Sequence, residues 1–166
     1  MKTKVLLIVT LILILTLSAC GGGDKPAANV AKEVEEFVFE AEDGYNITVD
    51  MDMDPVFERL GEPVKYYGAD SCAFDGQDKV YTYASFVITT RPEEDRDLIS
   101  CITLTDDSVS TPEGAHIGYS NAQVEELYGK GEEHMGGVKY HKGNCTLHFI
   151  ISQDKVISIE YLSKNL

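Results

Sequence analysis

The sequence predicts an α+β fold of two tandem repeats, each a short helix plus a three-strand antiparallel meander, with the helices on one face of a curved antiparallel sheet. Segments rich in Val, Ile, Tyr and Thr are separated by short polar turns, as in strands. The pattern Val-x-Glu-x-(Leu/Tyr)-Gly occurs at residues 56–61 and again 68 positions later, at 124–129. Residues 98–100 resemble residues 156–158 at an offset of 58, so the second copy is expected to be shorter.

The first twenty residues have the features of an export signal. Two lysines precede an apolar run, Val5–Leu17, and small residues and Cys20 follow. A membrane-spanning helix needs roughly 20 apolar residues, and this run is shorter. We therefore predict a cleaved signal peptide at 1–19 and a flexible tether at 20–35, which begins with three glycines after Cys20.

The segment Leu17-Ser18-Ala19-Cys20 resembles the lipobox of bacterial lipoproteins. This resemblance implies that the sulfur of Cys20 receives a diacylglycerol and that Cys20 becomes the mature N-terminus. The lipid bilayer is then one partner, and the protein is held at the extracytoplasmic face of the cell membrane through acyl chains, each methylene contributing about 0.8 kcal/mol. An ordinary secretory signal with a coincidental cysteine is the alternative.

The charge balance is strongly acidic. The chain has 14 Lys plus Arg and 28 Asp plus Glu, and removal of residues 1–19 deletes two lysines and no acid, leaving 12 against 28. No nucleic acid is expected as a partner, because such binding depends on Lys and Arg neutralising phosphates. No polybasic segment is present either, so the lipid is the expected membrane attachment.

The first half of the domain, residues 36–110, begins with a hairpin around an Asp-Gly turn. Asp54-Pro55 is a typical helix start, since aspartate accepts free amide hydrogen bonds and proline suits the first turn. Gly61 ends this helix. The expected elements are strands at 37–39 and 47–51, a helix from Asp54 to Gly61, and strands at 71–74, 80–90 and 98–105.

The second half, residues 111–166, repeats this order. Ser120 and Gln123 have the spacing of a capping box at the start of a helix, and Gly129 ends it. Three strands are expected after the helix, at 137–141, 146–151 and 156–162.

Residues 114–120, Gly-Ala-His-Ile-Gly-Tyr-Ser, followed by Val124 and Tyr128-Gly129, resemble the opening of a group of small extracytoplasmic domains. This group includes the secreted β-lactamase inhibitor protein and the small lipoprotein of the outer-membrane β-barrel assembly machinery. The resemblance implies helices on one sheet face and a second face that binds a partner protein. Residues 71–83 also resemble lipoproteins of Gram-positive anaerobes, which brings no activity with it.

Three residues are candidates for binding a partner. Tyr81 and Tyr83 share one face of the strand at 80–90, and they would form an interface if that face were the open one. In the alternative interpretation they only border the core. His148 lies between Leu147 and Phe149, so its side chain is expected to point away from the core, where it could line a groove.

No metal or cofactor is expected. His134, His141 and His148 recur at intervals of seven, but zinc ligands usually include close pairs, so exposed histidines on a polar face are the favoured interpretation. Asp50-x-Asp52-x-Asp54 resembles the start of a calcium loop, yet proline and glycine follow where that loop needs glycine and glutamate. A solvated edge leading to a helix cap is therefore expected.

The three remaining cysteines, Cys72, Cys101 and Cys145, each lie among apolar residues and are expected to be free buried thiols. A disulfide between Cys72 and Cys101 is the alternative. No serine lies in a Gly-x-Ser-x-Gly elbow. We therefore predict a non-catalytic module, not an enzyme, that binds a protein or cell-envelope component. The alternatives are a small-molecule or metal sensor with a groove near His141 and His148, and a cell-wall hydrolase.

Overall fold

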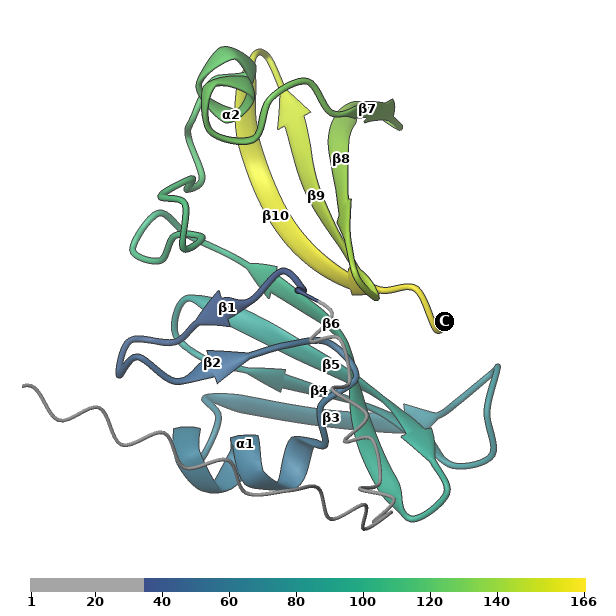
Figure 1. Ribbon diagram of the computed structural model, residues 1–166. Helices are drawn as coiled ribbons and strands as arrows, with labels where there is room; N and C mark the ends of the chain where they lie inside the picture. Colours follow the sequence, from purple (N-terminus) through teal and green to yellow (C-terminus); the bar gives the residue numbers. More distant parts are fainter. Residues whose placement is uncertain (1–34) are drawn as a thin grey trace, which may run out of the picture. The chain divides into compact units, whose positions relative to one another are not determined.

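The computed structural model describes residues 35–166. The predicted signal peptide at 1–19, Cys20 and most of the tether at 20–35 lie outside these residues. The described chain has an α+β fold with two short helices and a large antiparallel sheet, as predicted (Figure 1). Neither helix has the length or the apolar character needed to cross a bilayer.

Eight strands form the sheet in the order β3-β4-β5-β6-β10-β9-β8-β7, and all neighbours are antiparallel. A separate hairpin and the first helix precede β3, and the second helix precedes β7. The last strands of the two halves, β6 and β10, pair at the centre. The elements are β1 (Phe39–Glu40), β2 (Asn46–Ile47), α1 (Met53–Leu60), β3 (Lys65–Asp70), β4 (Gln77–Thr82), β5 (Phe86–Glu93), β6 (Arg96–Leu104), α2 (Asn121–Tyr128), β7 (Glu132–His134), β8 (Gly137–Lys142), β9 (Cys145–Ser152) and β10 (Lys155–Ser163).

Each half contributes four strands to the large sheet rather than the predicted three. The single strand expected at 80–90 is two strands, β4 and β5, with a turn between them. The strand expected at 71–74 is part of the turn between β3 and β4. Gly76 in that turn has a φ of 126°, and a Cβ there would lie 2.8 Å from the Cβ of Pro92. Only glycine fits this close approach.

The N-cap of helix α1 lies two residues earlier than predicted. Its N-cap is Asp52, whose carboxylate accepts a hydrogen bond of 3.0 Å from the amide of Asp54. The helix ends at Gly61, as predicted, with a φ of 75°. The N-cap is therefore an aspartate, as predicted, but it is Asp52 and lies two residues before Asp54.

Helix α2 has the predicted capping box. The hydroxyl of Ser120 accepts from the amide of Gln123 at 3.3 Å, and the Gln123 side chain accepts from the amide of Ser120 at 2.9 Å. These bonds satisfy amides that have no partner inside the helix. Gly129 ends the helix, as predicted.

Both helices and the β1–β2 hairpin pack on one face of the sheet, which we call the covered face. In α1, Phe57 lies 6.3 Å from Tyr81 of β4, measured between ring centroids. Tyr128 of α2 lies 5.3 Å from Phe149 of β9. The hairpin covers the centre, where strands of both halves meet.

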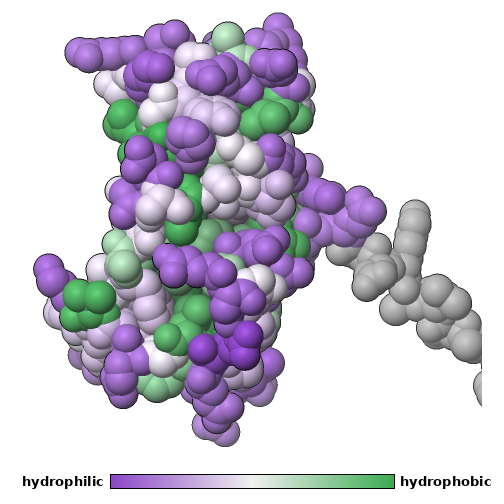
Figure 2. Space-filling model, turned by 90° about the vertical axis from the view of Figure 1, so that its left-hand side faces the viewer, coloured by the Kyte–Doolittle hydropathy of each residue, from purple (hydrophilic) through white to green (hydrophobic). Residues whose placement is uncertain are grey.

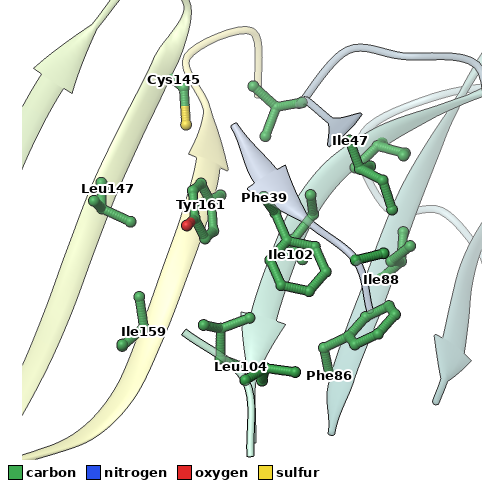
Figure 3. Packing of buried hydrophobic residues seen from close by; sticks show 14 of the residues in the cluster. Phe39, Ile47, Phe86, Ile88, Ile102, Leu104, Cys145, Leu147, Ile159 and Tyr161 are labelled. Carbon is green, nitrogen blue, oxygen red and sulfur yellow. The ribbon is translucent and has the colours of Figure 1, made fainter. Parts of the chain in front are cut away.

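A continuous hydrophobic core lies under these elements. Phe39 of the hairpin lies between the two halves, 4.8 Å from Phe86 and 6.1 Å from Tyr161 (Figure 3). Across the central pair, Tyr161 is opposite Ile102. Residues of both halves are thus buried in one cluster, which includes Ile47, Val56, Ile88, Leu104, Val124, Leu147, Phe149 and Ile159.

Candidate functional site

The face opposite the helices is formed by the strands alone among the described residues. Successive side chains of a strand alternate between faces, so the neighbours of the buried core residues point to this side. We call it the open face. It carries Val80, Thr82, Val87, Thr89, Cys101, Thr103, Lys139, His141, Thr146, His148, Glu160 and Leu162.

The open face has two chemically different parts. In the middle of β4, β5 and β6 it carries short aliphatic and hydroxyl side chains, a group that we call the Val–Thr patch, and Asp78 of β4 lies at one end of this group. On β8, β9 and β10 it carries imidazole and charged groups. The Val–Thr patch consists of Val80, Thr82, Val87, Thr89 and Thr103, all half-buried.

The predicted site residues Tyr81 and Tyr83 are not on the open face. Tyr81 is buried on the covered face against Phe57 and Tyr66, and this burial raises its pKa to about 12. Tyr83 stacks on Phe86 with ring centroids 5.0 Å apart. Of the two interpretations that the sequence left open, the burial of these residues supports the one in which both border the core.

His148 points to the open face, as predicted, but it does not line an exposed groove. The residue is only 7% exposed. Its Nδ1 lies 3.3 Å from a carboxylate oxygen of Glu160 on β10. Its Nε2 is buried and has no hydrogen-bond partner. The ring of His134 lies beside it, with centroids 5.9 Å apart.

His141 lies on the open face of β8 and is exposed, as expected. Its Nδ1 is 2.9 Å from the hydroxyl of Thr146, and its Nε2 is 3.3 Å from Glu132. Among residues 35–166, no group of three or more His, Cys, Asp or Glu side chains is arranged to hold a metal ion. Of the three histidines at intervals of seven, the first and the last, His134 and His148, form a close pair of imidazoles.

Asp50 does not lie on a solvated edge, contrary to the prediction. Its carboxylate is 3.3 Å from the guanidinium of Arg91, a side chain of β5 that is buried. It also accepts hydrogen bonds of 2.8 Å from Ser163 and Asn165 at the end of the chain. Hydrogen bonding to Glu93 raises the pKa of Arg91. This network has a structural role. In the sequence, the feature that indicates it is an arginine within an apolar strand.

The three cysteines are free thiols. Cys145 is buried, as predicted, Cys101 is half-buried and Cys72 is exposed, which corrects the expectation for Cys72. Burial raises the pKa of Cys101 to about 11 and that of Cys145 to about 12. Both therefore stay protonated at neutral pH and are poor nucleophiles.

We expect iodoacetamide at pH 8 to alkylate Cys72 rapidly and to leave Cys101 and Cys145 unmodified in the folded protein. Cys145 is buried and Cys101 is half-buried on the open face; burial raises the pKa of both thiols, so both are protonated at that pH, and only the thiolate reacts. Peptide mapping by mass spectrometry reads each site separately. Unfolding in urea should make all three react, and equal rates in the folded protein would contradict the placement.

Two open clefts flank the helices. One, of about 660 Å³, lies beside α2 and β8 and is lined by Glu125, Lys130, His134 and Tyr140. The other, of about 370 Å³, lies beside α1, and Phe57, Tyr66 and Lys79 line it. Figure 2, seen from the left-hand side of Figure 1, shows hydrophobic residues in separate areas surrounded by hydrophilic ones.

No protein-family model and no curated protein matches this sequence. Two solved structures are distantly similar to the fold. One is an extracellular protein containing an SCP domain from Bacillus anthracis str. Ames, with 11% identity and a TM-score of 0.41. The other is a cysteine-rich secretory protein from Staphylococcus aureus subsp. aureus Mu50, with 12% identity and a TM-score of 0.45.

The alignments with these two extracellular or secreted bacterial proteins span 70% of this chain, but only 44% and 45% of theirs. No functional residue is transferred from them.

Proposed function

We propose that this protein is a lipoprotein anchored through Cys20 at the extracytoplasmic face of the cell membrane, and that it acts as a non-catalytic binding module for a protein or cell-envelope partner. The Val–Thr patch is the observation that carries the proposal. Its five side chains, on β4, β5 and β6, carry no charge, in a chain with 28 acidic side chains. Depletion of charge is typical of the centre of a protein interface.

The surroundings of the patch indicate the chemistry of the partner. The sheet backbone holds the Val and Thr side chains in a fixed array, so little conformational entropy is lost when a partner covers them. The net charge of −14 favours a partner with basic groups around an apolar centre. This partner is expected to be a protein or a cationic envelope component rather than nucleic acid.

The contacts of the acidic loops favour a binding role over hydrolysis. Glu93 is paired with Arg91 and Arg96, and Glu132 lies 3.3 Å from His141. A glycoside hydrolase needs two carboxyl groups facing each other across the scissile bond. These two carboxylates are instead paired with basic side chains of their own neighbourhood.

We also propose that the two halves are tandem repeats. In the first half, residues 50–51 form two backbone hydrogen bonds with Ile99 of β6. In the second, residues 118–119 form the same two bonds with Val156 of β10. The paired segments are 68 residues apart, which is the offset of the two helices.

The anchoring is tested by Cys20→Ala. The variant is expected to lose the diacylglycerol and to move from the membrane fraction to the soluble or secreted fraction, because the sulfur that accepts the lipid is gone. Mass spectrometry of the N-terminal peptide and cell fractionation measure both effects. Cys72→Ala is the matched control and should stay lipidated and membrane-bound. A lipid-modified, membrane-retained Cys20→Ala protein would refute the lipobox interpretation.

The binding role is tested by cross-linking in intact cells, followed by affinity capture of the anchored protein. Val87→Lys and Thr103→Lys place charges in the Val–Thr patch and should reduce the amount of a captured partner at least tenfold. Leu127→Lys on α2, where Leu127 is 41% exposed, is the control and should leave capture unchanged. The proposal would be contradicted if the patch substitutions left the amount of captured partner unchanged, or if nothing were captured above a lipid-anchored control protein.

A further inference from the structure

We infer that His134 and His148 together bind one divalent transition-metal ion, Zn²⁺, Cu²⁺ or Ni²⁺, at the edge of the open face. This inference does not depend on the partner-binding role proposed above. It rests on the unpartnered nitrogen of His148, on the carboxylate that orients its ring, and on the position of the second imidazole.

His148 has one ring nitrogen engaged and one without a partner. The imidazole side chain is 9% exposed, and its Nδ1 lies 3.3 Å from Glu160. A proton on Nδ1 donated to this carboxylate leaves the lone pair on Nε2, which is buried and makes no hydrogen bond. A buried polar atom without a partner is unfavourable. Metal-binding histidines typically have this carboxylate–imidazole arrangement, in which the carboxylate fixes the tautomer and the ring orientation.

The second imidazole belongs to the residue that pairs with Gly137, which Nε2 of His148 approaches. A Cβ built on Gly137 would be 3.1 Å from Nε2 of His148, so this nitrogen lies over Gly137. His134 is the partner of Gly137 across the β7–β8 pair. The two imidazole rings are 5.9 Å apart between centroids and inclined at 72°. Two imidazoles that share an ion through metal–nitrogen bonds of about 2.1 Å have centroids about 5–6 Å apart.

The ion has a route from solvent. His134 borders the open cleft of about 660 Å³ beside α2, and it lies on the short edge strand β7. Water or a group of a partner would complete the coordination, because the described residues supply two imidazoles and no third ligand there. Imidazole favours zinc, copper and nickel over magnesium and calcium, with copper expected to bind most tightly.

The test is calorimetric titration of the purified full-length protein with ZnCl₂ and with NiCl₂. Binding of CuCl₂ is followed separately by electron paramagnetic resonance. We expect one ion per chain and coupling of copper to two ring nitrogens. His134→Ala and His148→Ala should each weaken binding at least tenfold. His116→Ala should not, because that ring contacts Tyr119 and the carbonyl of Ile117, away from the site.

Cys72→Ser is a second control, because this exposed thiol is a competing metal ligand. Binding that survives this substitution and is lost in His134→Ala supports the site. His134→Ala removes a side chain from an edge strand outside the core, so its loss of binding is not explained by unfolding, which circular dichroism checks. The inference is overturned if no ion binds, or if His134→Ala binds as tightly as the unsubstituted protein.

Discussion

Phe39→Ala is expected to lower the free energy of unfolding by about 3–5 kcal/mol. Phe39 is fully buried, and its ring makes an edge contact with Phe86 at 4.8 Å and lies 6.1 Å from Tyr161. Aromatic pairs of this kind contribute about 0.5–1.5 kcal/mol beyond the area they bury. Because the ring touches strands of both halves, its removal opens a cavity at the centre of the core.

The measurement is urea unfolding followed by far-ultraviolet circular dichroism. Phe37→Ala is the matched control, since Phe37 is the same residue type two positions earlier and is only half-buried, 6.3 Å from Tyr128. We expect the control to be destabilised by about 1 kcal/mol. If the two substitutions were equally mild, the hairpin would not contribute to the core as the contacts indicate.

Arg91→Ala is expected to destabilise the fold by about 3–5 kcal/mol, because removing the cation of a buried ion pair leaves the Asp50 carboxylate with neutral hydrogen-bond donors alone. The Arg91 side chain is 7% exposed and lies between Asp50 and Glu93. It also lies over the ring of Phe74, with 5.6 Å between the guanidinium carbon and the ring centroid. Asp50, which is 19% exposed, would lose its cationic partner.

Arg96→Ala is the control for this prediction. Arg96 contacts the same Glu93 at 3.4 Å, but its side chain is 50% exposed. An exposed pair contributes about 0–1 kcal/mol, and salt screens it further. Urea unfolding of both variants, at low salt and in 1 M NaCl, separates the two cases. A loss for Arg91→Ala no larger than that for Arg96→Ala would show that the buried pair does not hold Asp50 in place.

Local signals predicted most of the elements. The helix ends at Gly61 and Gly129 and the capping box of Ser120 depend on hydrogen bonds within a few residues, so the sequence pattern alone identifies them. The strands β8, β9 and β10 were predicted to within about one residue, because their alternating apolar residues and short polar turns are both local features.

The missed strands lack such a local signal. Four of the six residues of β3 are exposed, and β7 has three residues, so neither shows an apolar alternation. These edge strands form because backbone groups of β4 and β8 are available for pairing. The turn at 83–85 was missed because Tyr, Ala and Ser continue the composition of the strands on both sides.

By itself, the sequence determined that the chain alternates short helices with antiparallel strands, and that His148 and Phe149 point to opposite faces. Only the tertiary structure decided which face the helices cover, because alternation relates neighbouring side chains to each other and not to a distant element. Because the helices cover that face, Tyr81 lies in the core and the Val–Thr patch lies on the uncovered face. It also joined Asp50 to Arg91 and His134 to His148, since these contacts depend on strand pairings that are distant in sequence.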